Sequence, residues 1–136
     1  MVFHDCICFR LGKAVRKVSK AYRRELASYG PTHGQFLMMA AIMEADGLLP
    51  SGLADKTARD RATTTGLLGR LEKDGWIKRM PDKRDRRSLR IYLTPGSNKL
   101  KEHVLKLFEE TNQKIPNRFT PKEWDQMQTF LARLEQ

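Results

Sequence analysis

The chain has 136 residues, 40% of them hydrophobic and 31% charged, and a formal net charge of +10. This length and composition favour one globular domain with its own core, and no apolar run reaches the roughly 18 residues of a membrane span. The N-terminal apolar stretch contains Asp5 and soon reaches Arg10, so it lacks a secretory signal pattern and a cytoplasmic protein is expected.

The positive charge is concentrated in two segments of the chain. Residues 1–30 hold seven basic and two acidic groups, net +5, and residues 56–90 hold twelve and five, net +7. Residues 31–55 hold three acidic groups and neither Lys nor Arg, and residues 91–136 are nearly balanced. Such an excess favours a polyanionic partner, although a well-solvated surface is the alternative explanation.

Four helices are predicted in the first half of the chain. Apolar spacing predicts an amphipathic helix over residues 9–29 that ends at Gly30-Pro31. Thr32 to Gln35 has the form of a capping box, which predicts a buried helix from Phe36 to Met43 with Gly47 as its stop. A short helix is expected over 51–58 and another over 61–74, with Asp60 as N-cap and Gly75 as left-handed stop.

The hydrophobic period then changes from that of a helix to that of a strand. Residues 76–80 and 90–93 are predicted strands, and the charged residues 81–87 form the tip of the hairpin between them. Thr94-Pro95 is expected to restart a helix, with Thr94 as N-cap and Pro116 after its end. Thr120-Pro121-Lys122-Glu123 is a second capping box and opens the final helix.

This order of elements predicts a mainly α fold with a small β-hairpin wing, a winged helix-turn-helix. In such a fold one helix enters the major groove of DNA and the hairpin reaches the neighbouring backbone or minor groove. We expect a single domain over residues 1–136, with the winged part at about 33–94 and dimerisation helices at about 5–30 and 95–136. The terminal helices carry more apolar surface than the winged part covers, so a homodimer is expected.

The residues between 51 and 96 resemble the MarR (multiple antibiotic resistance regulator) family. The segments that carry the resemblance are Ser51-Gly52-Leu53-Ala54-Asp55, Asp60-Arg61-Ala62-Thr63-Thr64-Thr65, Arg70 to Arg79, Asp85-Arg86-Arg87 and Leu93-Thr94-Pro95-Gly96. The resemblance implies a homodimeric regulator that binds a pseudo-palindromic operator in double-stranded DNA, usually as a repressor. Gly66 and Gly69 depart from the family, which usually has larger residues there.

The candidate DNA contacts lie on the helix that begins at Arg61 and on the hairpin. Small polar residues permit close approach to DNA, and threonine binds phosphates or packs its methyl on thymine. The resemblance implies that Arg87 enters the minor groove and that Asp85 braces it. The predicted contacts are Ser51, Arg61, Ala62, Thr63, Thr65, Arg70, Arg84, Asp85, Arg86 and Arg87.

A signal for release from DNA has two candidate sites. Cys8 and Tyr22 resemble the reactive cysteine and its tyrosine in the organic-hydroperoxide-sensing branch of the family, although Gly12 and His33 stand where that branch has tyrosines. An inert cysteine in the dimer interface is the alternative, and a metal at His4, Cys6 and Cys8 would need further ligands. The second candidate is a pocket for a small aromatic effector. Its lining would be Tyr22, Phe36, Met38 and Met39, residues that serve equally well as plain core.

The sequence offers no enzyme site. It has no paired-carboxylate spacing, no glycine-rich phosphate loop and no metal quartet, so no enzymatic activity, cofactor or metal is expected. The competing hypothesis is a sequence-tolerant architectural DNA-binding protein that has no effector. Its affinity for one promoter and for random duplex would be the same.

Overall fold

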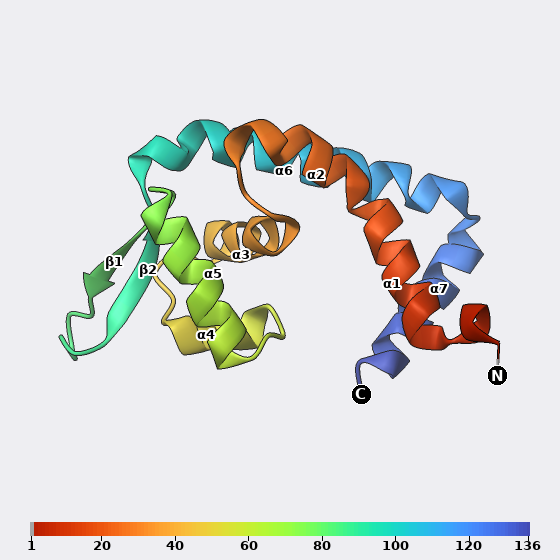
Figure 1. The fold of residues 1–136 in the computed structure, drawn as a ribbon, viewed down its shortest axis with the longest axis horizontal. Helices are drawn as coiled ribbons and strands as arrows, with labels where there is room; N and C mark the ends of the chain where they lie inside the picture. Colours follow the sequence, from red (N-terminus) through yellow and green to blue (C-terminus); the bar gives the residue numbers. More distant parts are fainter. Residues whose placement is uncertain (1) are drawn as a thin grey trace. The chain divides into compact units, whose positions relative to one another are not determined.

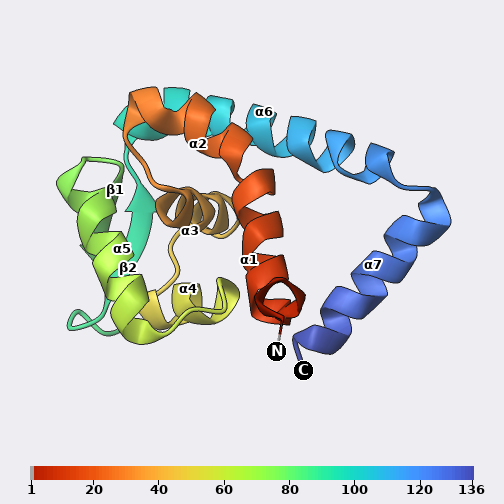
Figure 2. The same cartoon turned by 45° about the vertical axis from the view of Figure 1, so that its right-hand side comes forward.

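The computed structural model describes residues 2–136, and Figures 1 and 2 show the arrangement of its elements. The helices are α1 (Ile7–Val18), α2 (Lys20–Leu26), α3 (His33–Glu44), α4 (Pro50–Lys56), α5 (Arg61–Lys73), α6 (Asn98–Lys114) and α7 (Pro121–Leu134), and the strands are β1 (Ile77–Pro81) and β2 (Leu89–Leu93). This architecture confirms the prediction of helices with one hairpin. The chain divides into two compact units, 1–101 and 102–136, and the boundary falls within α6. The single domain over 1–136 stays a prediction.

The prediction of one helix over residues 9–29 is wrong. The structure has two helices there, α1 and α2, because the helix is broken at Ser19. Ser19 Oγ and Arg23 Nη2 both donate to the carbonyl oxygen of Arg16, at 3.4 and 2.9 Å. These side chains satisfy a carbonyl at the end of α1, so the backbone leaves the helix there and restarts as α2. After α2 a short 3-10 turn follows, and Gly30 ends the segment as expected with a φ of 88°.

Helix α3 forms the centre of the first unit. Its capping box is present: Gln35 N donates to Thr32 Oγ1 at 3.3 Å, and Thr32 N donates to Gln35 Oε1 at 2.7 Å. The helix is longer than the expected 36–43 because the cap fixes its start at His33. Buried on it are Gln35, Phe36, Met38, Met39, Ala41 and Ile42, which confirms the prediction of a largely buried helix.

The helix-turn-helix consists of α4, the turn 57–60 and α5. Asp60 caps α5, since Thr63 N donates to its Oδ1 at 2.7 Å and Thr63 Oγ1 donates to its Oδ2 at 2.8 Å. The turn contains Ala58 with a φ of 50°, a left-handed conformation that alanine rarely adopts. At the far end of α5, Gly75 has a φ of 81° and stops the helix as expected.

The hairpin pairs β1 with β2 in antiparallel register, from Ile77 opposite Leu93 to Pro81 opposite Leu89. A further segment lies beside β2, because Gly47 N donates to the Ile91 carbonyl at 2.8 Å and Ile91 N donates to the Leu48 carbonyl at 2.9 Å. The sequence analysis expected Gly47 only as a helix stop. These two bonds attach the loop after α3 to the wing.

Thr94 does not cap a helix, contrary to the expectation from sequence. Residues Pro95–Ser97 form a 3-10 turn and α6 begins at Asn98. Thr94 Oγ1 instead donates to the Gly75 carbonyl at 2.6 Å, across the chain to the end of α5. This bond joins the exit of the wing to the end of α5 and turns the hydroxyl toward Gly75, and the Thr94 side chain makes no cap hydrogen bond to the turn that follows.

The second unit contains most of α6 together with α7. The capping box of α7 is present, with Glu123 N donating to Thr120 Oγ1 at 3.2 Å and Thr120 N donating to Glu123 Oε2 at 2.9 Å. The ring of Phe119 lies 6.0 Å from that of Trp124 in the manner of a hydrophobic staple. On α7, the apolar side chains of Leu131 and Leu134 are exposed, 39% and 61%, in this single chain.

Candidate nucleic-acid interface

The outward face of α5 carries three small residues. Ala62, Gly66 and Gly69 follow one another at spacings of four and three, so they lie on one face of the helix. All three are exposed, and a Cβ added at either glycine would meet nothing within 4 Å. Neither glycine is therefore required by packing within the chain. The small side chains leave the backbone of α5 open to close approach by a partner.

Polar and charged side chains flank this ridge of small residues. Arg61 and Thr65 lie on one side of it and Arg70 on the other, all of them exposed. Thr65 Oγ1 donates to the Arg61 carbonyl at 2.8 Å, so its methyl group is the part left for outside contacts. Ser51, the second residue of α4, is exposed as well.

The first turn of α5 has an electrostatic character set by Asp60. The backbone N–H of Thr63, and then its hydroxyl, hold the pKa of the Asp60 carboxyl below its usual range. Thr63, expected to contact DNA, is therefore engaged in the cap through both of its donors. The carboxylate occupies the helix N-terminus that would otherwise attract a phosphate, so Thr63 is first a structural residue.

The tip of the wing presents one arginine that is both exposed and oriented. The Arg87 side chain is 95% exposed, and Asp85 Oδ1 accepts from its backbone N–H at 3.1 Å and from its Nε at 3.5 Å. Ser88 Oγ donates to Asp85 Oδ2 at 3.4 Å, and the Ser88 N–H donates to the Asp85 carbonyl. Asp85 thus lies against Arg87 in the relation that the resemblance implies. Arg84 and Arg86 are exposed beside it.

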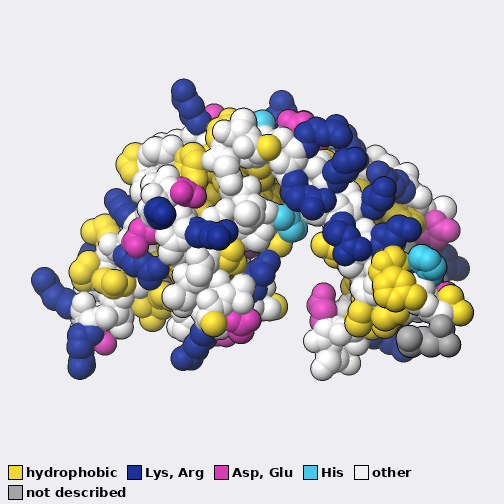
Figure 3. Space-filling view, viewed as in Figure 1, with side chains coloured by type: hydrophobic (Ala, Val, Ile, Leu, Met, Phe, Trp, Pro, Cys, Tyr) yellow, Lys and Arg dark blue, Asp and Glu magenta, His cyan; other side chains and the backbone are white. Residues whose placement is uncertain are grey.

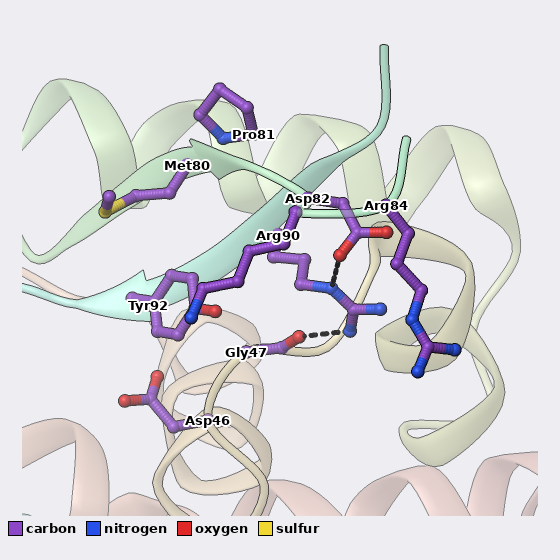
Figure 4. A pocket seen from close by; sticks show the side chains of 9 residues that line it. Asp46, Gly47, Met80, Pro81, Asp82, Arg84, Arg90 and Tyr92 are labelled. Atoms are coloured by element: carbon purple, nitrogen blue, oxygen red, sulfur yellow. Dashed lines mark hydrogen bonds and ion pairs between the residues drawn. The ribbon is translucent and has the colours of Figure 1, made fainter. Parts of the chain in front are cut away.

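The end of the hairpin strands nearest the tip is held by residues that were missed from the sequence. Arg90 Nε donates to Asp82 Oδ1 at 2.8 Å, and its Nη1 donates to the Gly47 carbonyl at 2.8 Å, as Figure 4 shows. Hydrogen bonding from Arg90 holds the pKa of Asp82 below its usual range, and the same bond raises that of Arg90. One side chain therefore fixes both hairpin strands to the loop after α3. The sequence did contain a signal for this contact, because Asp82 and Arg90 stand at similar sequence distances on either side of the hairpin tip.

Below this pair the hairpin and the loop after α3 enclose an open cavity of about 520 Å³. Its walls include Met80, Tyr92 and Asp46, and the side chain of Arg84 extends along its edge in Figure 4. Arg79 also joins the wing to α5, since its Nε lies 3.3 Å from Glu72 Oε2. The wing and α5 are thus tied to a common frame.

Comparisons with known proteins agree with this geometry. The MarR family model matches residues 32–89. The "Organic hydroperoxide resistance transcriptional regulator" of Bacillus subtilis is 30% identical over 105 residues, which cover 77% of this chain and 71% of that protein. The chain belongs to the MarR family. The "HTH-type transcriptional regulator TtmR" of Methylorubrum extorquens is 34% identical over 95 residues, 70% of this chain, and the match spans about half of that protein, 49%.

The solved structures show the same fold. The S. aureus MepR–DNA complex matches with a TM-score of 0.85 at 24% identity, covering 94% of this chain and 95% of that one. The predictions of the MarR family and of a winged helix fold are confirmed. The DNA contacts predicted residue by residue stay predictions.

The two residues of the predicted cysteine site, Cys8 and Tyr22, lie on different helices of the chain. Cys6 and Cys8 are exposed free thiols, Cys8 in the first turn of α1. Tyr22 lies on α2 and is buried, with its ring 4.7 Å from that of Phe36 and 6.0 Å from that of His33. The redox hypothesis for Cys8 and Tyr22 stays a prediction.

The proposed effector residues lie in the core of this MarR chain. Tyr22, Phe36, Met38 and Met39 are at most 6% exposed. An effector among them would require these side chains to move apart. Beside them, burial and then the charges of Arg23 and Arg59 lower the pKa of His33, whose Nδ1 is buried without a hydrogen-bond partner in the described part of the chain.

Two further observations concern residues 2–136. Among them, no group of three or more His, Cys, Asp or Glu side chains is arranged to hold a metal ion. Nor does this part of the chain contain a helix with the length and apolar character that crossing a membrane requires.

Proposed function

We propose that this chain is a sequence-specific regulator of transcription that binds double-stranded DNA as a homodimer in the cytoplasm, without enzymatic activity. The observation that carries the proposal is Arg87, held outward at the wing tip by Asp85 while α5 presents its ridge of small residues on the same frame. Similarity to proteins named as HTH-type transcriptional regulators supports it.

In this proposal α5 enters the major groove and the wing follows the backbone. The ridge of Ala62, Gly66 and Gly69 lets the helix approach the base edges, while Arg61 and Arg70 reach the phosphates on either side. A guanidinium held at the wing tip fits a narrow and electronegative minor groove. Asp85 orients Arg87 before binding, so less side-chain entropy is lost when the complex forms.

The regulator acts as a repressor that a small aromatic molecule or an oxidant releases from its operator. The name of the B. subtilis relative supports an oxidant signal, and so does the exposure of Cys8. Oxidation of a thiolate to a sulfenic acid, followed by a disulfide to a thiol of the second copy, would strain α1. The small-molecule alternative requires the core around Tyr22 to open, because a ligand would have to enter between side chains that are packed together.

A second candidate function is sequence-tolerant, architectural DNA binding. The specific observation that favours it is again the ridge, because glycines offer no side chain with which to read a base edge. The two functions differ in how strongly the protein prefers one duplex over random sequence.

Selection of duplexes from a random library, followed by titration at fixed salt, tests the proposal. A regulator enriches a pseudo-palindrome with half-sites about 10 base pairs apart and binds it at least about 10³-fold more tightly than random duplex. In the same assay Arg87→Ala weakens binding to the enriched duplex more than about tenfold without lowering Tm, since the side chain packs on nothing. Arg133→Ala, an exposed arginine of α7, is the matched control. An absence of enrichment would establish the architectural function, and full affinity of Arg87→Ala would remove the wing from the interface.

A further inference from the structure

Helices α1 and α2 carry a second concentration of positive charge. Between residues 10 and 24 there are seven basic residues and no acidic one, and all seven are exposed. They are Arg10, Lys13, Arg16, Lys17, Lys20, Arg23 and Arg24, here called the α1–α2 basic surface. Figure 3 shows Lys and Arg side chains crowded over these two helices.

These charges are not neutralised within the described chain. Across residues 2–136 the ion pairs involve other cations, and none joins a residue of the α1–α2 basic surface to a carboxylate. Arg23 donates to a backbone carbonyl, which leaves its charge uncompensated. Several pairs, such as Lys13 with Lys17 and Lys20 with Arg24, stand four residues apart, where like charges repel along a helix. A bound polyanion would relieve this repulsion.

The α1–α2 basic surface stays free when the apolar side of α1 is covered. Ile7, Leu11, Val15 and Val18 repeat at spacings of four, four and three, so they lie on one face of α1, and they are exposed by 38–58%. The basic residues of α1 lie on the remaining circumference. A second copy of the chain that buries the apolar stripe therefore leaves the cations in solvent.

The α2 part of the α1–α2 basic surface is also separate from the DNA interface proposed above, while α1 runs downward from α2 in Figures 1 and 2. In both Figure 1 and Figure 2, α2 lies at the top of the first unit, whereas the wing tip and α4 lie at its bottom. A DNA duplex bound along α5 and the wing tip would therefore not contact α2. Neutralising the basic residues of α2 would therefore require a different polyanionic segment.

We propose that the α1–α2 basic surface is a second, sequence-independent DNA-binding surface that holds the phosphate backbone of a duplex segment other than the one bound by α5 and the wing. Because the helix is broken at Ser19, the two segments are taken separately: α1 extends about 12 Å from Arg10 to Val18 and α2 about 9 Å from Lys20 to Leu26 at 1.5 Å per residue, about 21 Å in sum. Duplex DNA carries about 12 phosphate charges over that length, so seven cations match the phosphates of the side that faces them.

The composition of the surface favours duplex DNA over two other polyanions. Single-stranded nucleic acid is held by exposed aromatic rings, whereas Tyr22, the aromatic residue between positions 10 and 24, is buried. A membrane-surface helix needs open apolar side chains next to its cations. Tyr22 and Leu26 of α2 are both in the core, and the apolar stripe of α1 is the face that a second copy covers in the expected dimer. A phosphate backbone requires neither.

The test compares two variants that each remove four charges, three from lysine and one from arginine. The first is K13Q/K17Q/K20Q/R24Q, which keeps Arg23 because its side chain donates to the Arg16 carbonyl at the helix break. The matched control is K99Q/K106Q/K122Q/R133Q, four exposed positions on α6 and α7. A third variant, R61A/R87A, addresses the interface of α5 and the wing.

Affinity for a random-sequence duplex of about 30 base pairs is measured against salt concentration. Each lost phosphate contact makes the slope of log affinity against log salt concentration shallower by about 0.9, so K13Q/K17Q/K20Q/R24Q is expected to lose about 3.6 units of slope and the control none. In a second measurement, the protein is first bound to an immobilised duplex and is then tested for its ability to retain a second, labelled duplex. The wild type and the control retain the second duplex, whereas the first variant does not.

The outcomes separate this inference from the proposed function. If R61A/R87A loses affinity and K13Q/K17Q/K20Q/R24Q matches its control, the α5 and wing interface stands and the second surface does not exist. If the reverse holds, the second surface stands and the assignment of α5 and the wing falls. The pairs K13Q/K17Q and K20Q/R24Q, each losing about half of the effect, keep the test decisive should the quadruple variant fold poorly. Wild-type binding to vesicles of phosphatidylserine and phosphatidylcholine, lost in the first variant while duplex binding is unchanged, would overturn DNA in favour of lipid.

Discussion

Gly66 is the residue at which stability and DNA binding are expected to diverge. It lies inside α5 with open space where a Cβ would be, so Gly66→Ala removes the backbone entropy cost of glycine and stabilises the fold by about 1 kcal/mol. Gly66→Leu adds a bulky group to the ridge that faces DNA in the proposed function. We expect a raised Tm for both variants, but an affinity for the selected duplex at least about tenfold lower for leucine.

Gly34→Ala in α3 is the matched control for this pair, since its added Cβ meets only the side chains of Leu67 and Arg59 at ordinary contact distances and it belongs to neither proposed DNA-binding surface. It tests whether removing a helical glycine alone alters DNA binding. Unchanged affinity of Gly66→Leu would show that the ridge does not face the groove, whatever happens to Tm. Melting curves and duplex titration on the same preparations measure both effects.

His33 gives the fold a dependence on pH. Burial, and then Arg23 and Arg59, lower its pKa in the folded chain below the ordinary value of 6.5, so the unfolded chain binds a proton more readily. Stability therefore rises with pH through the window between the lowered pKa and 6.5, and it is lost as the pH falls through that window. We expect His33→Gln to flatten this part of the stability curve.

Urea unfolding at several values between about pH 5 and 7.5 measures the slope. His4→Gln, at an exposed position outside the core, is the matched control and keeps the wild-type slope. A slope that persists in His33→Gln would assign the pH dependence to other groups.

Among the helices and strands, the features that can be predicted from the sequence are those formed by residues close together in the chain. Both capping boxes, at Thr32 and Thr120, are present because a cap joins atoms only three residues apart. The break at Ser19 was missed, since it depends on a guanidinium seven residues from the Arg16 carbonyl. The pairing of Gly47 with Ile91 was missed for the same reason, because its partners are 44 positions apart in the chain.

The same distinction applies to the candidate site. Asp85 and Arg87 were found through the resemblance to the MarR family, which implies their contact over two residues, whereas Asp82 and Arg90 are eight apart and Arg90 also reaches Gly47. Whether Tyr22, Met38 and Met39 line a pocket or fill the core could not be read from spacing alone, because an apolar stripe has the same pattern in both cases.

The stiffness of the wing is expected to depend on the Asp82–Arg90–Gly47 contact. Arg90→Gln removes the charged bond to Asp82 and shortens the reach to the Gly47 carbonyl, so the hairpin loses its attachment to the loop after α3. We expect faster amide exchange at Ser88 and Ile91 and an affinity for the selected duplex several-fold lower, because Arg87 is then less well placed.

Arg86→Gln is the matched control for the wing, since it removes the same charge from the tip without an internal bond. It is expected to lower affinity through charge alone and to leave amide exchange unchanged. Equal exchange rates in Arg90→Gln and the wild type would show that the strands alone fix the wing. Hydrogen exchange followed by mass spectrometry or NMR provides the measurement.

At the scale of the whole molecule, the exposed apolar residues of α1 and α7 call for a second copy of the chain. Val15 is 58% exposed on α1, and Phe130 and Leu134 are 55% and 61% exposed on α7. Soluble monomers rarely leave an apolar helix face open to solvent, whether on α1 or on α7, and a two-fold symmetric interface buries the same residues on both copies. The chain of 15.8 kDa is therefore expected to sediment as a species of twice that mass at micromolar concentration.

Leu134→Asp tests this interface, because a carboxylate buried against apolar side chains without a partner is costly in a dimer and harmless on an exposed helix face. We expect the variant to sediment as a monomer with its helical circular dichroism retained, and to bind the selected duplex at least about 10²-fold more weakly, since each half-site is then bound separately. Lys122→Asp places the same carboxylate elsewhere on α7 and is expected to remain dimeric. A Leu134→Asp protein that stays dimeric would move the interface away from α7, and a monomeric wild type would leave two-fold operator recognition without a structural basis.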